Sequence, residues 1–261
     1  MAAGIPKERS VELIEMFGDM LYAGISIIEI DYWRFAKELE KMDTPNAKSA
    51  LGLLHAVAGK FDKSFEVFES ALESYDDPSI AHNYCFSIEK SGDIDLLRSK
   101  VYEYSDRYGS KRLTSMAYNF AYQFGQRDEL VKYIDQHIKL LSEDEGRSLA
   151  EKHKTELLAE LDLAYRNSGC TEQQFQTLAS IMIKITQKHD AKAGLVEASR
   201  VQSRSIVLDI INKDPKAIAQ MNFELAEAVC MEPILDGCDL IGRFSPKRDL
   251  NIGVSYVNTK H

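Results

Sequence analysis

Three glycines at equal spacing constrain this chain more than any other feature of its sequence. Gly59, Gly92 and Gly125 follow one another at intervals of 33 residues, between segments whose apolar residues recur at helical spacing. Glycine commonly ends a helix because it adopts a left-handed backbone at little cost. A fixed period in helix pairs is typical of repeat proteins, whose units stack because one pair cannot bury its apolar face alone. The spacing therefore predicts a row of antiparallel helix pairs.

These glycines divide the predicted helices into three regular pairs. Pro45 and Pro78 also stand 33 residues apart, and proline suits the first turn of a helix because its missing N–H costs nothing there. The three pairs are predicted to span residues 46–58 and 61–74, 78–90 and 94–107, and 110–124 and 127–141.

Less regular helix pairs are predicted on both sides of this row. Ser10 is expected to cap the first of them, and Ile30 and Trp33 are expected to be buried in the second. After the row, Gly169 separates a further pair but falls out of the period. The predicted ranges are 11–22 and 28–42 before the row, and 149–166 and 172–188 after it.

The first regular unit, residues 46–76, carries a pattern of large and small residues. One helix has a large residue followed by a small one, and the next has a small residue, an aromatic residue and a small residue with leucine. These residues are Leu51-Gly52, Ser64, Phe68 and Ala71-Leu72. The pattern resembles the tetratricopeptide repeat, and the likeness extends by period over roughly residues 46–142. The second unit keeps the large-small pair as Tyr84-Cys85, whereas Ala117-Tyr118 reverses it in the third.

The resemblance implies a solenoid whose first helices line a concave surface that binds a protein or peptide. The partner-binding residues that it implies are His82, Phe86, Glu89, Arg112, Asn119, Tyr122 and Gln123. The alternative is that this surface is only solvated and that loops or the C-terminal part hold the partner.

Some members of this family grip the C-terminal carboxylates of a partner with basic residues and asparagines. Asn83 and Arg112 match that clamp, but Ser49, Leu53 and Met116 stand where the family has basic residues or asparagine. The resemblance therefore does not predict binding of a chaperone tail.

The last part of the chain has a different pattern. Asp214-Pro215 is a helix start, and short β-branched or alternating runs around that helix are typical of strands. We expect a short helix or linker over 190–202 and strands over 205–211, 238–244 and 250–257. The fold class is therefore mainly α, with a helical solenoid over 1–199 and a small β-α-β-β unit over 200–261. This unit is expected to dock on the last helices or to pair its edge strand with a second copy.

The charge is unevenly distributed. The chain carries a net charge of -9, and residues 200–261 contribute none of it because their acidic and basic residues balance. Binding of nucleic acid is not expected, since Lys and Arg supply most of the affinity for phosphates. An acidic body would instead favour encounter with a basic protein.

The four cysteines are scattered and form no C-x-x-C pair, which is typical of reduced thiols in a cytoplasmic protein. Cys230 and Cys238 could be read as a redox pair or half of a zinc site, but two small buried residues are the favoured interpretation. The first residues lack a continuous apolar run, so no signal peptide is expected. No apolar run is long enough to predict a membrane span.

Motifs for catalysis or cofactor binding do not occur. The six histidines lie in different units without metal-ligand spacing, and the i, i+3 pair of His153 and Glu156 has no further ligand nearby. Phosphate-binding, dinucleotide-binding and hydrolase motifs do not occur. We therefore expect no catalytic residue, cofactor or metal.

Three hypotheses for function follow. The first is a non-enzymatic scaffold or adaptor that binds a protein through the solenoid. The second is an acidic immunity or inhibitor protein that neutralises a basic toxin or nuclease, which strong salt dependence would favour. The third is an enzyme or sensor with a site between the solenoid and the C-terminal unit, which a bound metal or metabolite would favour.

Overall fold

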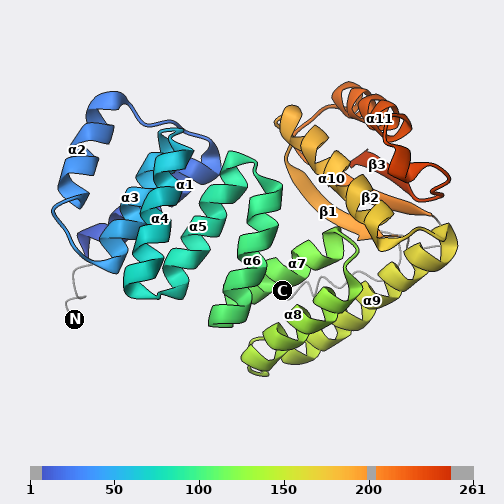
Figure 1. The fold of residues 1–261 in the computed structure, drawn as a ribbon, viewed down its shortest axis with the longest axis horizontal. Helices are drawn as coiled ribbons and strands as arrows, with labels where there is room; N and C mark the ends of the chain where they lie inside the picture. Colours follow the sequence, from blue (N-terminus) through green and yellow to red (C-terminus); the bar gives the residue numbers. More distant parts are fainter. Residues whose placement is uncertain (1–7, 199–203, 248–261) are drawn as a thin grey trace, which may run out of the picture. The chain divides into compact units, whose positions relative to one another are not determined.

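The computed structural model describes residues 8–198 and 204–247, which are mostly helical with one small three-stranded sheet (Figure 1). The six helices of the three regular pairs begin and end within one residue of their predicted bounds. The first five helices are α1 (Arg9–Ala23), α2 (Glu29–Leu39), α3 (Pro45–Val57), α4 (Phe61–Tyr75) and α5 (Pro78–Ser91). They are followed by α6 (Ile94–Tyr108), α7 (Lys111–Gln123), α8 (Arg127–Leu140), α9 (Arg147–Ser168) and α10 (Glu172–Lys188).

The bends between paired helices confirm the role predicted for the periodic glycines. Gly59, Gly92 and Gly125 have φ angles of 70°, 86° and 69°, all in the left-handed region. A side chain at such a position meets the following carbonyl, so glycine is the residue of least cost there. The 33-residue period of these glycines therefore marks the ends of successive helices.

The chain forms two compact units, which divide between Ala117 and Tyr118 within α7. Each unit has its own core and is described here by itself. The expected division at residues 199 and 200 is a different one and stays a prediction.

In the first unit, α3 is the central helix and packs against α1, α2, α4 and α5. Its residues from Ser49 to Val57 are all buried. Gly52 lies against the ring of Phe68, and that ring stacks on Tyr84 with a centroid distance of 5.5 Å. The family-like residues of the first repeat are thus packing residues.

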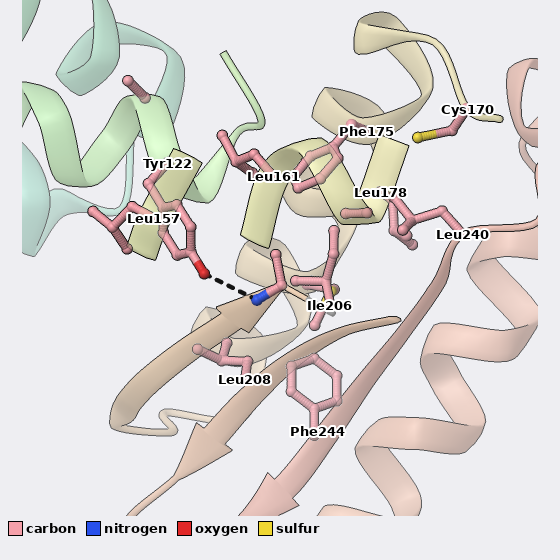
Figure 2. Packing of buried hydrophobic residues seen from close by; sticks show 14 of the residues in the cluster. Tyr122, Leu157, Leu161, Cys170, Phe175, Leu178, Ile206, Leu208, Leu240 and Phe244 are labelled. Carbon is pink, nitrogen blue, oxygen red and sulfur yellow. Dashed lines mark hydrogen bonds between the residues drawn. The ribbon is translucent and has the colours of Figure 1, made fainter. Parts of the chain in front are cut away.

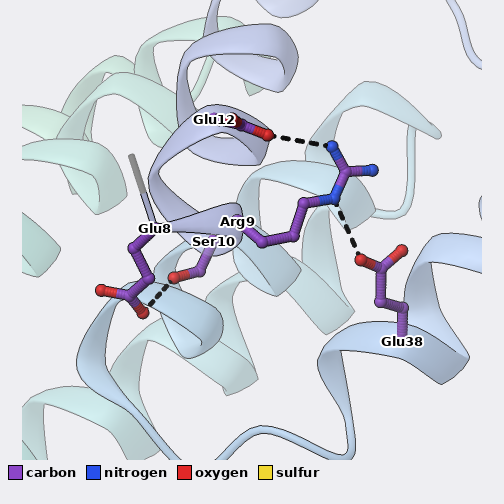
Figure 3. A network of polar contacts seen from close by, with 5 residues as sticks. All are labelled: Glu8, Arg9, Ser10, Glu12 and Glu38. Atoms are coloured by element: carbon purple, nitrogen blue, oxygen red, sulfur yellow. Dashed lines mark hydrogen bonds and ion pairs between the residues drawn. The ribbon is translucent and has the colours of Figure 1, made fainter. Parts of the chain in front are cut away.

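The start of α1 differs from the prediction. Glu8, not Ser10, occupies the cap position, and Ser10 is buried in the first turn, where its hydroxyl donates to the Glu8 carboxylate (Figure 3). Arg9 joins α1 to α2, because its guanidinium reaches Glu12 at 3.2 Å and Glu38 at 3.1 Å. The first turn of α1 is therefore held by a hydrogen bond between two side chains and by the Arg9–Glu38 ion pair to α2.

The buried face of α2 also differs from the prediction. Tyr32, Phe35 and Leu39 are buried, whereas Ile30 and Trp33, which were expected in the core, are exposed. Only one face of α2 packs on α3, and helical geometry turns Ile30 and Trp33 away from it. Their apolar character alone did not fix that direction.

In the second unit, two strands follow α10 directly. The strands are β1 (Ala193–Ala198), β2 (Ser205–Ile210) and β3 (Ile241–Pro246), with α11 (Pro215–Cys230) and a 3-10 helix, η1 (Pro233–Leu235), before β3. The sheet order is β1-β2-β3, with β1 antiparallel and β3 parallel to β2. The predicted helix or linker is therefore wrong for residues 193–198, residues 199–202 lie outside the described residues, and the described order is β-β-α-β. The predicted strand over 250–257 lies outside the described residues.

Helices α9 and α10 and the sheet share one apolar core (Figure 2). Leu161 of α9, Phe175 and Leu178 of α10 and Leu208 and Phe244 of the sheet are among its buried residues. This core includes residues on both sides of the expected boundary at 199, because a three-stranded sheet needs a covering layer for stability.

On each outer strand of the described sheet, a side chain bonds backbone groups of one residue. The Ala198 N–H on β1 donates to the Tyr122 hydroxyl oxygen at 3.0 Å (Figure 2). On β3, the Asn222 amide accepts from the Phe244 N–H at 2.8 Å and donates to its carbonyl at 2.9 Å. Unpaired edge groups invite pairing with another chain, and such caps oppose it. They weigh against the expectation that a second copy pairs there.

Candidate functional site

Four of the predicted binding residues belong to the first unit. His82 and Phe86 on α5 are half-buried, and Glu89 and Arg112 are exposed. Burial lowers the pKa of His82, and the nearby positive charge of Arg112 lowers it further, so the imidazole is neutral at pH 7. Asn83, which matches the family clamp, donates its amide to Ser49 at 2.7 Å.

The other three predicted residues belong to the second unit. Asn119 is exposed and Gln123 is half-buried, but Tyr122 is only 5% exposed and lies in the core. The Tyr122 hydroxyl donates to the Glu160 carboxylate and accepts from the Ala198 N–H. Burial and Glu160 raise its pKa well above the ordinary value. Tyr122 holds β1 in place and offers a partner no surface, so we withdraw it from the binding residues.

An exposed apolar surface that the sequence reasoning missed lies at the end of α1 and the start of α2. Five large apolar side chains there are exposed: Tyr22 65%, Ile25 57%, Ile28 63%, Ile30 75% and Trp33 57%. We call this set the α1–α2 apolar surface. Single exposed apolar residues are ordinary, whereas contiguous exposed apolar patches are typical of interaction sites, so this set is the candidate surface of the first unit. The sequence indicated this surface by the isoleucines that follow Gly24 in the loop between the two helices.

Two lysines stand over aromatic rings of this region. Lys60 Nζ lies 3.5 Å from the ring centroid of Tyr32 and 5.2 Å from that of Trp33. Lys90 Nζ lies 5.2 Å from the ring centroid of Tyr22 and 5.3 Å from that of Phe86. Both arrangements have the geometry of cation–π contacts, which hold an ammonium group over a ring face.

A buried polar pair joins α2 to α3. His55 on α3 shares a hydrogen bond of 3.1 Å with the hydroxyl of Tyr32. Burial, followed by the charges of Lys63 and Lys60, lowers the pKa of His55 to about 4, so the ring is neutral at pH 7. This bond joins α2 to α3 at the buried side chain of Tyr32.

Grooves lie between helices of the second unit. One, of about 420 Å³, lies between α8 and α9 and is lined by Tyr118, His137, His153 and Glu156 among others. The Tyr118 ring lies 5.4 Å from His137 and 6.4 Å from His153 by centroid distance. His153 and Glu156 thus line one groove, but the described part of the chain contains no group of three metal-ligating side chains.

The second groove, of about 450 Å³, lies between α10 and α11 and is lined by Ile185, Lys188, Glu224 and Met231 among others. Glu224 accepts from Lys188 at 2.9 Å and pairs with His189 at 3.1 Å. These contacts lower the pKa of Glu224 to about 2. A carboxylate held in this way is ionised and internally engaged, which does not suit a general acid or base.

The four cysteines are free thiols. Cys85 and Cys170 are buried, and burial raises the pKa of the Cys85 thiol to about 12, so it is not a nucleophile at neutral pH. Cys230 is exposed and Cys238 is half-buried. The interpretation of both as small buried residues is therefore wrong for Cys230, which lies at the exposed end of α11.

No family model, curated protein or solved structure matches this chain. Among the residues that the structure describes, no helix is both long and apolar enough to cross a membrane.

Proposed function

We propose that this chain is a non-enzymatic scaffold or adaptor, built as a tetratricopeptide-like helical solenoid, that binds another protein through the α1–α2 apolar surface. The exposure of five large apolar side chains between Tyr22 and Trp33 carries the proposal. Exposing that much apolar area is costly in water unless a partner covers it. The free thiols of the cysteines support a cytoplasmic setting.

The composition of this surface supports a protein as the ligand. Trp and Tyr are enriched among residues that contribute most to binding energy, and aliphatic neighbours exclude water around them. Trp33 is the single tryptophan of the chain. The predicted concave residues Phe86 and Arg112 remain a competing surface in the same unit.

A comparison of three baits tests the proposal. The wild-type chain, an Ile30→Ser/Trp33→Ser variant and an Arg112→Ala/Asn119→Ala variant are used to purify partners from native cells, with quantitative mass spectrometry. We expect a partner of the wild type to bind the Arg112/Asn119 variant and to be lost from the Ile30/Trp33 variant. Equal capture by the Ile30/Trp33 variant would move the site away from this surface. Far-UV circular dichroism of both variants checks that they are folded.

The acidic inhibitor is a second candidate because the net charge of -9 favours a basic partner. Salt separates the two. Binding through apolar side chains is little affected between low and physiological salt, whereas association with a basic toxin or nuclease weakens strongly as surface charges are screened. A captured partner that dissociates in moderate salt would favour the inhibitor.

A further inference from the structure

We infer that the segment recognised by the α1–α2 apolar surface is an acidic amphipathic segment of a partner, with carboxylates flanking its apolar face. This inference rests on the proposed function. The partner segment is expected to be acidic at this surface, whereas the net negative charge of the whole chain would favour a basic partner.

Two lysines lie beside aromatic residues of this surface. Lys60 stands over Tyr32 and Trp33, and Lys90 stands over Tyr22 and Phe86, so ammonium groups lie beside aromatic residues from both ends of the surface. Within the described ranges, neither ammonium group has a carboxylate at ion-pair distance. The cation–π contacts hold both charges in place with their hydrogen-bond donors still available.

Two carboxylates close to Trp33 in sequence already accept hydrogen bonds within α2. Asp31 pairs with Arg34 at 2.8 Å, and Glu29 accepts from the Trp33 indole nitrogen at 3.4 Å. Arg34 therefore balances the charge of Asp31, whereas Glu29 keeps its charge. The groups beside the apolar side chains that can donate hydrogen bonds to a partner are Lys60 and Lys90. Complementary charge at the rim of an apolar patch sets orientation and partner choice more than it sets affinity.

The two lysines contrast with the acidic character of the whole chain. The chain carries a net charge of -9, so an acidic partner is repelled from most of its surface. Lys60 and Lys90 provide local attraction beside an apolar area. The two lysines therefore favour docking of an acidic amphipathic segment at this surface over the acidic parts of the chain.

Trp33 provides a direct assay because it is the only tryptophan in the full chain. The probes are two short helical peptides without tryptophan, one of leucine and glutamate and one with every glutamate replaced by lysine. Each is titrated against the full chain while the emission of Trp33 is recorded. We expect the glutamate peptide to bind with a dissociation constant about tenfold lower, from two exposed ion pairs.

A Lys60→Gln/Lys90→Gln variant should lose this preference while its circular dichroism stays unchanged. A Lys139→Gln variant, which changes an exposed lysine of α8, is the matched control and should keep it. Equal binding of the two peptides, or tighter binding of the lysine peptide, would overturn the inference and leave the proposed function standing.

Two other outcomes also overturn the inference. If neither peptide changes the emission of Trp33, the acidic segment is wrong, and the bait comparison decides the proposed function separately. If Trp33 emission and the hydrodynamic size change with protein concentration alone, and Ile30→Ser abolishes both changes, a second copy of the chain occupies the surface.

Discussion

Replacing Gly52 by alanine sets two physical effects against each other. Gly52 lies in the interior of α3, where alanine is favoured over glycine by about 1 kcal/mol because it loses less backbone entropy. However, a Cβ atom at this position would lie 2.6 Å from two ring carbons of Phe68. Phe68 is fully buried and stacked on Tyr84, so the ring has little room to move.

The packing effect should be the larger one. Forcing an extra carbon into a packed core costs about 1–3 kcal/mol, and the gain in helix propensity offsets about 1 kcal/mol of that cost. We expect Gly52→Ala to lower the free energy of unfolding by roughly 1 kcal/mol. Gly18 is the matched control, because it lies inside α1 where a Cβ atom would have no packing neighbour within 4 Å, and Gly18→Ala should raise that energy by about 1 kcal/mol.

Urea unfolding followed by far-UV circular dichroism measures both variants, and a changed midpoint at constant slope reports stability. A Gly52→Ala/Phe68→Leu double variant should be more stable than the sum of the two single changes predicts, because the smaller side chain makes room for the new methyl group. If Gly52→Ala were as stabilising as Gly18→Ala, the contact between α3 and the Phe68 ring would be refuted.

Three further predictions concern a bend, a sheet edge and a buried histidine. Gly59→Ala should lower the free energy of unfolding by about 1 kcal/mol because alanine is strained in the left-handed backbone. Gly125→Ala should lower it further, because its Cβ atom would also lie 2.5 Å from the ring of Phe175. Urea unfolding measures both variants, and equal costs would contradict this packing. Asn222→Leu removes both hydrogen bonds to Phe244 on β3, so it should lower the free energy of unfolding by about 1–3 kcal/mol. The exposed strand edge should also cause self-association, measured by size-exclusion chromatography. A stable monomer would show that the edge needs no cap. Because folding lowers the pKa of His55 from 6.5 to about 4, the unfolded chain binds the extra proton in that range, and stability should fall by on the order of 3 kcal/mol as pH drops from 7 to 4. A His55→Gln variant should lose that part of the pH dependence, and an unchanged pH profile would contradict the buried neutral imidazole.

The sequence alone determined where the helices of the regular pairs begin and end. Glycine at a left-handed bend and proline in a first turn act through the local backbone, so their effects can be predicted without the rest of the fold. The sites at Gly59, Gly92 and Gly125 are of this kind. Of the candidate site, the half-buried or exposed positions of His82, Phe86 and Arg112 are compatible with the predicted binding surface, but their role stays a prediction.

Tertiary structure decided which side of each element meets another element. Trp33 and Tyr122 are both aromatic residues on predicted helices, yet Trp33 is exposed and Tyr122 is buried. Tyr122 lies in a core that includes the sheet, where its hydroxyl accepts from the Ala198 N–H, whereas Trp33 lies on the face of α2 that does not pack on α3. The strand β1 was missed for the same reason: its backbone is fixed by pairing with β2, which local composition does not record. Helix ends depend on neighbours in sequence, whereas burial, sheet pairing and exposed surfaces depend on neighbours in space.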